Sequence, residues 1–290
     1  MTKIINNYIA LITDFGSNGQ HFVACMKGVI LKINSTVKII DISHNITPFS
    51  ILEGAYILKS IYKYFPKGTI FVAVIDPGVG SARKIIILET SSGFYFVGPD
   101  NGLFTYIINN EEISKIIEIS NQDYFLEPVS DTFHGRDIMA PVSAYLSKGI
   151  SIENFGNPLE IDNITKLNDL SPKIIENEKI IEGKIQYIDS FGNCITNIEL
   201  DNENKSKNLG IQFLHKDSYK MNLKGKDLKF IFLSYYEELS SYLKMSRNPL
   251  LKRDSFNFLE LSLNMKSFAQ TFNISVGEIF YIKKDQFNLD

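Results

Sequence analysis

Residues 69–88 read TIFVAVIDPGVGSARKIIIL, two apolar runs joined by a polar loop that contains two glycines. The first run, 69–75, is typical of a buried strand and ends at Asp76. The second run, 84–88, predicts another strand, which Arg83 opens. The sequence therefore predicts a carboxylate and a guanidinium at one edge of a sheet, where open α/β folds bind ligands.

A second glycine-bearing loop, residues 131–137, reads DTFHGRD and carries His134. An imidazole placed with Asp76 and Arg83 suits the positioning and polarisation of a water molecule. The residues alone leave plainer interpretations open. Asp76 can belong to a tight turn, Arg83 can be its ion-pair partner, and His134 can be structural.

Strand-like and helix-like segments alternate through the first half of the chain. Near-continuous apolar strands in this order indicate an α/β N-terminal domain, residues 1–160, with a largely parallel sheet flanked by helices. The expected strands are 8–13, 37–42, 69–75, 84–88 and 94–97, and the expected helices are 21–33, 50–65 and 138–147.

Helical periodicity fades in the second half. Asn, Asp, Pro and Lys cluster in residues 161–181, which we interpret as a linker. Short strand-like segments then predict a smaller antiparallel β-barrel-like C-terminal domain over 182–290. These segments are 183–189, 195–200, 210–214, 228–233, 256–263 and 278–283.

Composition narrows the function classes. The net charge of −3, with no basic block, gives no indication of a nucleic-acid partner. No apolar stretch is long enough for a membrane span and no signal peptide is recognised, so we expect a cytoplasmic protein without a membrane partner. Cys25 and Cys194 are too far apart in sequence to indicate a cysteine zinc site, and we expect no metal.

Two further segments carry candidate binding groups. Asp14 follows the first expected strand, where a carboxylate can bind the vicinal hydroxyls of a ribose or simply cap a turn. In residues 189–197, DSFGNCITN, the amide of Asn193 can read an adenine edge or belong to an ordinary hairpin turn. His21 and His44 are interpreted as hydrogen-bonded loop or helix-start histidines.

Taken together, these segments resemble the S-adenosyl-L-methionine hydroxide adenosyltransferase family, the hydrolase relatives of the S-adenosylmethionine-dependent fluorinases and chlorinases. The matching pieces run in the family's order and cover nearly the whole chain. They are TDFG at 13–16, HNITP at 44–48, VIDPGVG at 74–80, GPDNG at 98–102, TFHGRD at 132–137 and IDSFGN at 188–193.

The resemblance implies hydrolysis of S-adenosyl-L-methionine to adenosine and L-methionine by SN2 attack of an activated water or hydroxide at C5′. Asp76, Arg83 and His134 match the family's water-activating set, which the halogenases lack. Either Asp76 or His134 can be the base. S-adenosylmethionine is the substrate, so no cofactor is expected. The family forms homotrimers, with each active site between the N-terminal domain of one subunit and the C-terminal domain of its neighbour.

The resemblance also implies a set of substrate-binding residues. Asp14 would hold the ribose, Phe49 stands where halogenases have a tryptophan, and Phe133 and Gly135 would line the pocket near C5′. Asp189 and Ser255 would bind the methionine end, Asn193 the adenine, and Asn264 and Met265 would complete the adenine side. Asn257 stands where the family has glycine. The alternative functions are a non-catalytic S-adenosylmethionine or adenosine sensor and a halogenase.

Overall fold

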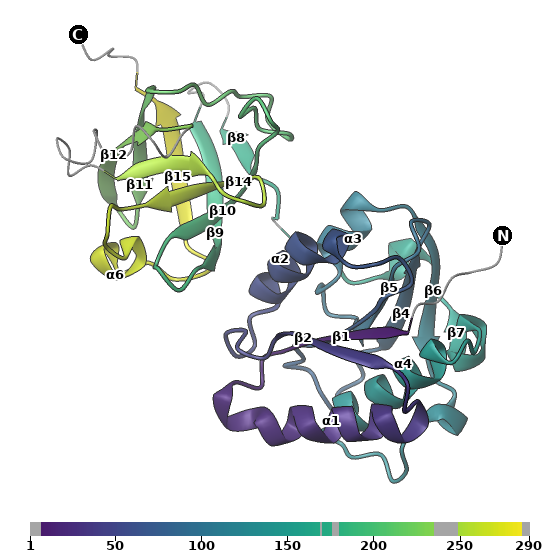
Figure 1. Cartoon of the computed structure of the whole chain (residues 1–290). Helices are drawn as coiled ribbons and strands as arrows, with labels where there is room; N and C mark the ends of the chain where they lie inside the picture. The colour runs from purple at the N-terminus through teal and green to yellow at the C-terminus, as the bar shows by residue number, and fades with distance from the viewer. Residues whose placement is uncertain (1–6, 169, 176–179, 235–248, 286–290) are drawn as a thin grey trace. The chain divides into compact units, whose positions relative to one another are not determined.

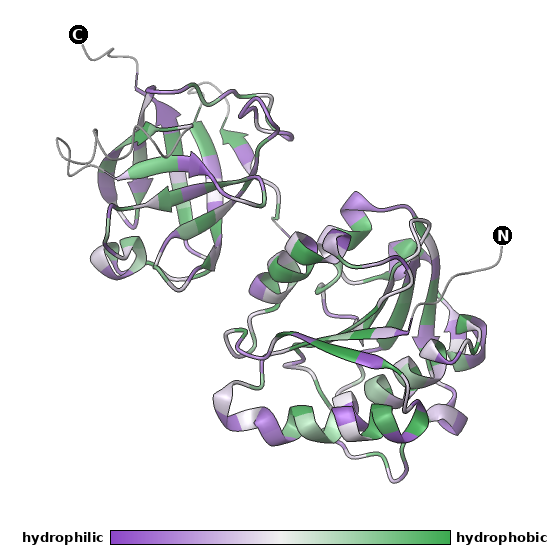
Figure 2. Ribbon diagram, in the orientation of Figure 1, coloured by the Kyte–Doolittle hydropathy of each residue, from purple (hydrophilic) through white to green (hydrophobic). Residues whose placement is uncertain are grey.

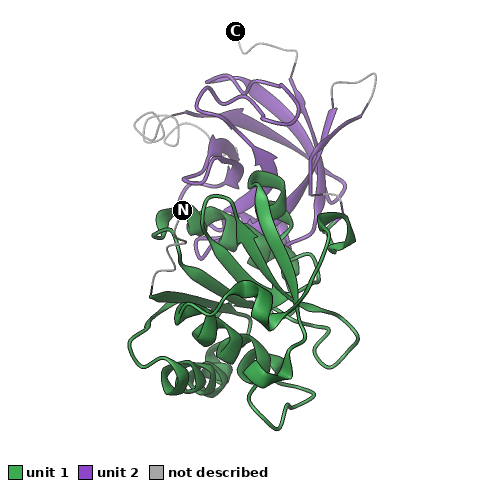
Figure 3. Cartoon of the chain, turned by 90° about the vertical axis from the view of Figure 1, so that its right-hand side faces the viewer, with its two compact units in different colours: residues 1–167 green, residues 168–290 purple. Residues whose placement is uncertain are grey.

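The computed structural model describes residues 7–168, 170–175, 180–234 and 249–285. The chain forms two compact units, Met1–Leu167 and Asn168–Asp290, each with its own core (Figure 3). The division after Leu167 falls inside the range interpreted as a linker. That range also contains a short strand, β8 (Lys173–Ile175), and its residues 169 and 176–179 lie outside the described residues.

Unit 1 is an α/β structure, as the sequence predicts (Figure 1). The three helices and five strands that were expected are present. Helix α3 and strands β6 and β7 were not expected. The strands are β1 (Tyr8–Thr13), β2 (Lys38–Ser43), β3 (Ile70–Val74), β4 (Ile85–Thr90), β5 (Tyr95–Pro99), β6 (Ile113–Ile119) and β7 (Gly156–Pro158). The α-helices are α1 (Gln20–Ile33), α2 (Ile51–Ile61), α3 (Thr105–Asn110) and α4 (Ala140–Ser147).

The seven-stranded sheet of unit 1 has the order β2-β1-β3-β5-β4-β6-β7. The neighbours from β2 to β5 are parallel, whereas β4 runs antiparallel to both β5 and β6, and β7 antiparallel to β6. The largely parallel sheet is therefore confirmed, with β4 and β7 as its two reversed strands. Thr13 pairs with Val74, so the carboxyl ends of β1 and β3 meet at one edge.

Helices cover both faces of this sheet, α1 and α4 on one and α2 and α3 on the other (Figure 1). The central strands β3, β4 and β5 are buried along their whole length and are largely apolar, because each face of the sheet packs against a helix layer (Figure 2). Full burial of one aliphatic side chain contributes about 1.5–3 kcal/mol, so this core is a major stabilising element of unit 1.

The helix expected over 138–147 begins earlier, as a π-helical turn at Gly135–Met139 that leads into α4. Pro141 lies in the first turn of α4, where a missing N–H costs no intrahelical bond. Single π-helical turns occur frequently at functional sites, and this one directly follows His134.

Unit 2 confirms the predicted β-barrel. Strands β9, β10, β14, β13, β12, β11 and β15 pair in that order, and β15 pairs with β9 to close the ring, while β8 pairs with β9 outside it. Its elements are β8 (Lys173–Ile175), β9 (Ile180–Ile188), β10 (Cys194–Glu199), β11 (Ser218–Leu223), β12 (Lys226–Phe232), β13 (Leu250–Arg253), β14 (Phe258–Ser262), β15 (Ile279–Lys284) and the short helix α6 (Phe268–Phe272).

One expected strand of unit 2 is wrong and two barrel strands were missed. Residues 210–214 form no strand, because Gly210 turns with a φ of +68° and Gln212 makes only an isolated bridge with Lys205. Strands β11 and β13 were not expected. Among the described helices, none is both long and apolar enough to cross a bilayer.

Candidate active site

Arg83 joins Asp76 to His134 in a single hydrogen-bonded group. Its Nε lies 3.0 Å from both Asp76 carboxylate oxygens, and its Nη2 also donates to Oδ2. The same Nη2 lies 2.9 Å from His134 Nδ1. Arg83 and Asp76 are thus an ion pair, as the plainer interpretation held, and Arg83 also contacts the imidazole 51 positions further along the chain.

The direction of the Arg83–His134 bond fixes the tautomer of the histidine. A guanidinium has only donors, so Nδ1 of His134 accepts. Burial, together with the positive charge of Arg83, lowers the pKa of His134 below its ordinary value of 6.5. The ring is therefore neutral at pH 7, and its proton is on Nε2.

The backbone explains why these groups meet. Asp76 follows β3, and the amide of Asn101 donates to the carbonyl of Ile75 over 2.9 Å, which fixes the chain just before the carboxylate. His134 precedes the π-helical turn, and Gly135 packs against β3. A Cβ on Gly135 would lie 3.1 Å from a methyl carbon of Val74, so a small residue allows this approach.

Asp14 lies beside this group at the same edge of the sheet. Its backbone N–H lies 3.4 Å from the carbonyl of Val74, and its Oδ2 accepts the backbone N–H of Phe49 over 2.8 Å. Burial raises the pKa of Asp14 above its ordinary value, the negative charge of Asp76 adds to this, and the Phe49 hydrogen bond opposes it. Because Asp14 follows β1 and Asp76 follows β3, and these strands pair, the two residues lie at the same edge of the sheet.

Two predicted binding residues expose a large apolar side chain on a left-handed backbone. Phe49 has a φ of +67° and is 70% exposed, and Met265 has a φ of +51° and is 96% exposed. Bulky residues rarely adopt this conformation, and strained backbone clusters at ligand sites. Both positions therefore fit a role in contacting a ligand.

Phe133, by contrast, is half-buried in an aromatic cluster. Its ring meets Phe15 and Phe22 edge to face, with centroids 5.9 and 5.2 Å apart. The guanidinium carbon of Arg136 lies 5.0 Å from the centre of the Phe133 ring. This packing holds the residue next to His134 in place.

In unit 2, a pocket of about 480 Å³ brings together three predicted binding residues, Asn193, Asn264 and Met265. Asp189 lies next to it and accepts three hydrogen bonds, from the N–H groups of Phe191 and Asn193 and from the Asn193 amide. The loop 189–193 is thus a hairpin turn, as its plainer interpretation held, and it also presents Asn193 to a pocket.

Ser255 is the predicted residue that the structure does not bring to this pocket. It lies in the exposed turn between β13 and β14, whereas the pocket is lined by Leu250 and Ser262 at the other end of that hairpin. The turn itself explains the departure at Asn257, which has a φ of +70°. Asparagine tolerates this left-handed conformation better than other residues with a Cβ.

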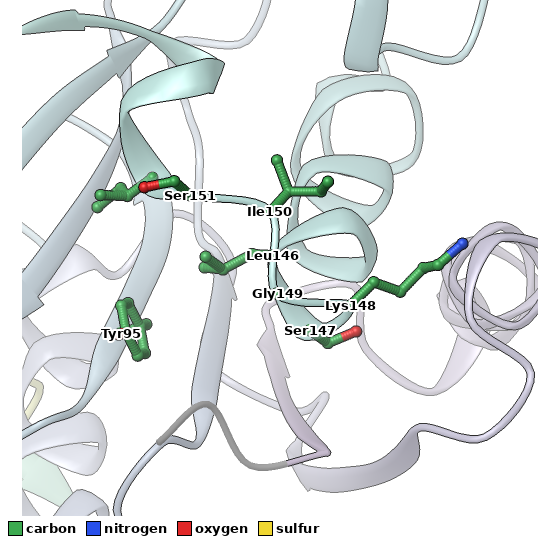
Figure 4. Close-up of a pocket in the computed structure, with 8 residues that line it drawn as sticks. Tyr95, Leu146, Ser147, Lys148, Gly149, Ile150 and Ser151 are labelled. Atoms are coloured by element: carbon green, nitrogen blue, oxygen red, sulfur yellow. The ribbon is translucent and has the colours of Figure 1, made fainter. Parts of the chain in front are cut away.

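Unit 1 has a pocket of its own, of about 340 Å³. It lies between Tyr95 and the segment that follows α4 (Figure 4). Tyr95 pairs with Ile70 at the start of the parallel strands, so this pocket is at the edge opposite to Asp76. Ligands of open α/β sheets bind at the carboxyl ends of the strands, which favours the Asp76 edge as the candidate active site.

Sequence patterns did not single out Asp137, which is fully buried. Its carboxylate accepts the Ser130 N–H over 2.9 Å. It also forms an ion pair with Arg136, whose guanidinium donates to both carboxylate oxygens. It thereby fixes the loop that leads to His134. The described residues contain no group of three His, Cys, Asp or Glu side chains arranged for a metal ion.

Residues 9–156 match the profile of the SAM hydroxide adenosyltransferase N-terminal domain, and residues 183–280 match that of the C-terminal domain. A Methanocaldococcus jannaschii protein named (R)-S-adenosyl-L-methionine hydrolase is 40% identical over 280 residues, 94% of this chain and 95% of that relative.

More distant relatives include a fluorinase of Actinoplanes, 29% identical over 67% of this chain and 72% of its own length. Among solved structures, an uncharacterized conserved protein from Thermotoga maritima aligns with a TM-score of 0.81 and 33% identity. The alignment covers 94% of this chain and 99% of that one.

Proposed function

Because this chain belongs to the S-adenosylmethionine hydroxide adenosyltransferase family, we propose that it hydrolyses S-adenosyl-L-methionine to adenosine and L-methionine. The relative named (R)-S-adenosyl-L-methionine hydrolase matches nearly the full length of both chains. The observation that carries the proposal is the contact of Arg83 with both Asp76 and His134, a group suited to activating water.

The proposed step is an in-line displacement at C5′. The water oxygen forms a bond to C5′, the C5′–S bond breaks, and its electron pair stays on sulfur as the neutral thioether of methionine. The proton of the water leaves to a base. A hydroxide-like nucleophile and a sulfonium cancel their charges as they react, so a site that excludes bulk water favours the reaction.

We assign the base role to Asp76. The His134 tautomer supports this, because Nδ1 is engaged by Arg83 and Nε2 already carries a proton. Oδ1 of Asp76 accepts one hydrogen bond from Arg83, and a carboxylate oxygen has room for a second. Arg83 stabilises the developing hydroxide by its charge, and the Nε2–H of His134 orients the water as a donor.

The binding roles implied by the resemblance are part of the same proposal. In unit 1, Asp14 holds the ribose hydroxyls, Phe49 packs on the substrate, and Phe133 and Gly135 lie near C5′. In unit 2, Asp189 and Ser255 bind the methionine end, and Asn193, Asn264 and Met265 form the adenine side. The pocket shared by Asn193, Asn264 and Met265 supports the adenine assignment, whereas Ser255 lacks such support.

We further propose a cytoplasmic homotrimer that needs no cofactor. Water supplies the nucleophile and the sulfonium supplies its own leaving group, so the reaction balances without another reactant. Sedimentation equilibrium of the purified protein tests the trimer directly.

The experiment that tests the activity also separates it from its two alternatives. Purified protein is incubated with S-adenosylmethionine in excess chloride or fluoride, and the products are separated by chromatography. We expect adenosine and methionine in equal amounts. A 5′-halogenated nucleoside would indicate a halogenase, and bound but unchanged substrate would indicate a sensor.

A further inference from the structure

His44 is a buried histidine whose two ring nitrogens are both engaged. Nδ1 lies 3.0 Å from Thr13 Oγ1, and Nε2 lies 3.0 Å from Asp41 Oδ1. Lys27 Nζ lies 2.5 Å from the other oxygen of Asp41. These contacts join helix α1, strand β2 and the end of β1 at one point, next to the loop that carries Asp14.

The hydrogen bond between His44 and Asp41 has a definite direction. Burial raises the pKa of Asp41, but hydrogen bonds from Lys27 and His44 outweigh it and hold that pKa below its ordinary value. An ionised carboxylate only accepts, so Nε2 of His44 donates to it. Nδ1 of His44 is the partner of the Thr13 hydroxyl, whose oxygen also accepts the Phe15 N–H over 3.4 Å.

The backbone of His44 holds the same loop. Its carbonyl accepts the N–H of Gly16 over 2.7 Å. Asp14 therefore lies between Thr13 and Phe15, and both neighbours belong to the hydrogen-bond network that starts at His44. On the other side, its carboxylate accepts the Phe49 N–H. The carboxylate is held before any ligand arrives, and such preorganisation lowers the cost of binding.

We propose that His44 is a positioning residue, acting through Thr13 to hold the Asp14 carboxylate in the orientation that binds a pair of vicinal hydroxyls. This inference rests on the proposed function, because it takes the ribose of the substrate as the ligand of Asp14. The Asp41–Lys27 pair holds the imidazole ring in turn.

Thr13 offers a matched pair of variants. Thr13→Val removes the hydroxyl with little change of shape, whereas Thr13→Ser keeps it. The readout is the affinity for adenosine, measured by titration calorimetry, because this ligand is not turned over. We expect Thr13→Val to weaken binding about tenfold, the size of one lost hydrogen-bond contribution, and Thr13→Ser to restore most of the affinity.

A double-mutant cycle with Asp14→Ala separates positioning from a general effect on the fold. In the Asp14→Ala background, Thr13→Val should cause no further loss of adenosine affinity. His44→Ala should behave like Thr13→Val in both backgrounds, and thermal unfolding reports whether each variant folds.

Equal losses of affinity in the two backgrounds would overturn the inference, and so would full affinity in Thr13→Val. Failure of the unmodified protein to bind adenosine is a different result. It would overturn this inference alone, whereas failure to form adenosine from S-adenosylmethionine would overturn the proposed function and this inference with it.

Discussion

Gly80 approaches the backbone of Asp131 so closely that a Cβ on Gly80 would lie 2.5 Å from the Asp131 carbonyl oxygen. Gly80 belongs to the loop between Asp76 and Arg83, and Asp131 to the loop that leads to His134. This contact therefore sets the spacing of the two loops that carry the candidate catalytic groups.

Gly80→Ala should lower turnover at least about tenfold, because the added methyl group forces the two loops apart. The residue also has a φ of +78°, which costs a residue with a Cβ about 1–2 kcal/mol. Gly149→Ala is the matched control, since Gly149 has a φ of +88° and no atom within 4 Å of its added Cβ. Both variants should lose stability in thermal melts, and only Gly80→Ala should lose turnover. Similar kinetics for the two would refute this role of the contact.

Arg83→Lys should lower kcat on the order of 10²-fold, although it keeps the charge. A lysine ammonium is a single point donor and cannot bind both oxygens of Asp76 and Nδ1 of His134 in the same planar geometry. Arg253→Lys, in which the native guanidinium donates to the Asp201 carbonyl, serves as control. If Arg83→Lys keeps near-native kcat, charge alone suffices and the bridging geometry is not required.

As the pH falls through 6.5, protonation of His134 should cause no decrease in kcat/KM. Burial and the charge of Arg83 lower the pKa of His134, so the ring stays neutral to a more acidic pH than a free histidine. The folded protein then binds fewer protons than the unfolded chain, and stability rises with pH through this window. A kinetic limb above 6.5 that is absent from His134→Gln would contradict the assigned tautomer.

Glu260→Gln should change the pH dependence of stability in unit 2. Burial raises the pKa of Glu260 from 4.5 to about 6, and Lys252, 3.0 Å away, opposes the rise. Between these values the folded state holds a proton that the unfolded chain has lost. The unfolding free energy therefore falls as the pH rises, by about 2 kcal/mol. Hydrogen exchange of the β14 amides measures this fall, which should be absent in Glu260→Gln. An identical slope in both proteins would contradict it.

Apolar runs in the sequence predicted the central strands of unit 1, because the residues of each strand determine its burial. The apolar run 8–13 coincides with β1, and the runs on either side of Asp76 and Arg83 correspond to β3 and β4. The apolar runs are nearly continuous because helices cover both faces of the sheet, and they therefore indicated a sheet buried on both faces. The antiparallel direction of β4 depends on its pairing with β5 and β6, which no pattern within residues 84–88 specifies.

For the site, the sequence predicted which residues take part and the sheet edge at which they lie, but not their contacts. That Arg83 bonds His134 is a tertiary contact, and so is the Thr13–His44 bond across 31 positions. His44 was correctly interpreted as a hydrogen-bonded histidine, but its partners, and hence its link to Asp14, required the structure. Short barrel strands such as Leu250–Arg253 lack enough residues for an alternating pattern, so their neighbours define them.

Hydrolysis in ¹⁸O-labelled water tests the central claim most directly. The purified protein is incubated with S-adenosylmethionine, and the nucleoside product is analysed by mass spectrometry with fragmentation of the ribose. We predict adenosine that carries ¹⁸O at its 5′ oxygen, together with unlabelled methionine, because the water oxygen attacks C5′. Substrate that is bound but recovered intact, or adenosine without the label, would contradict the account.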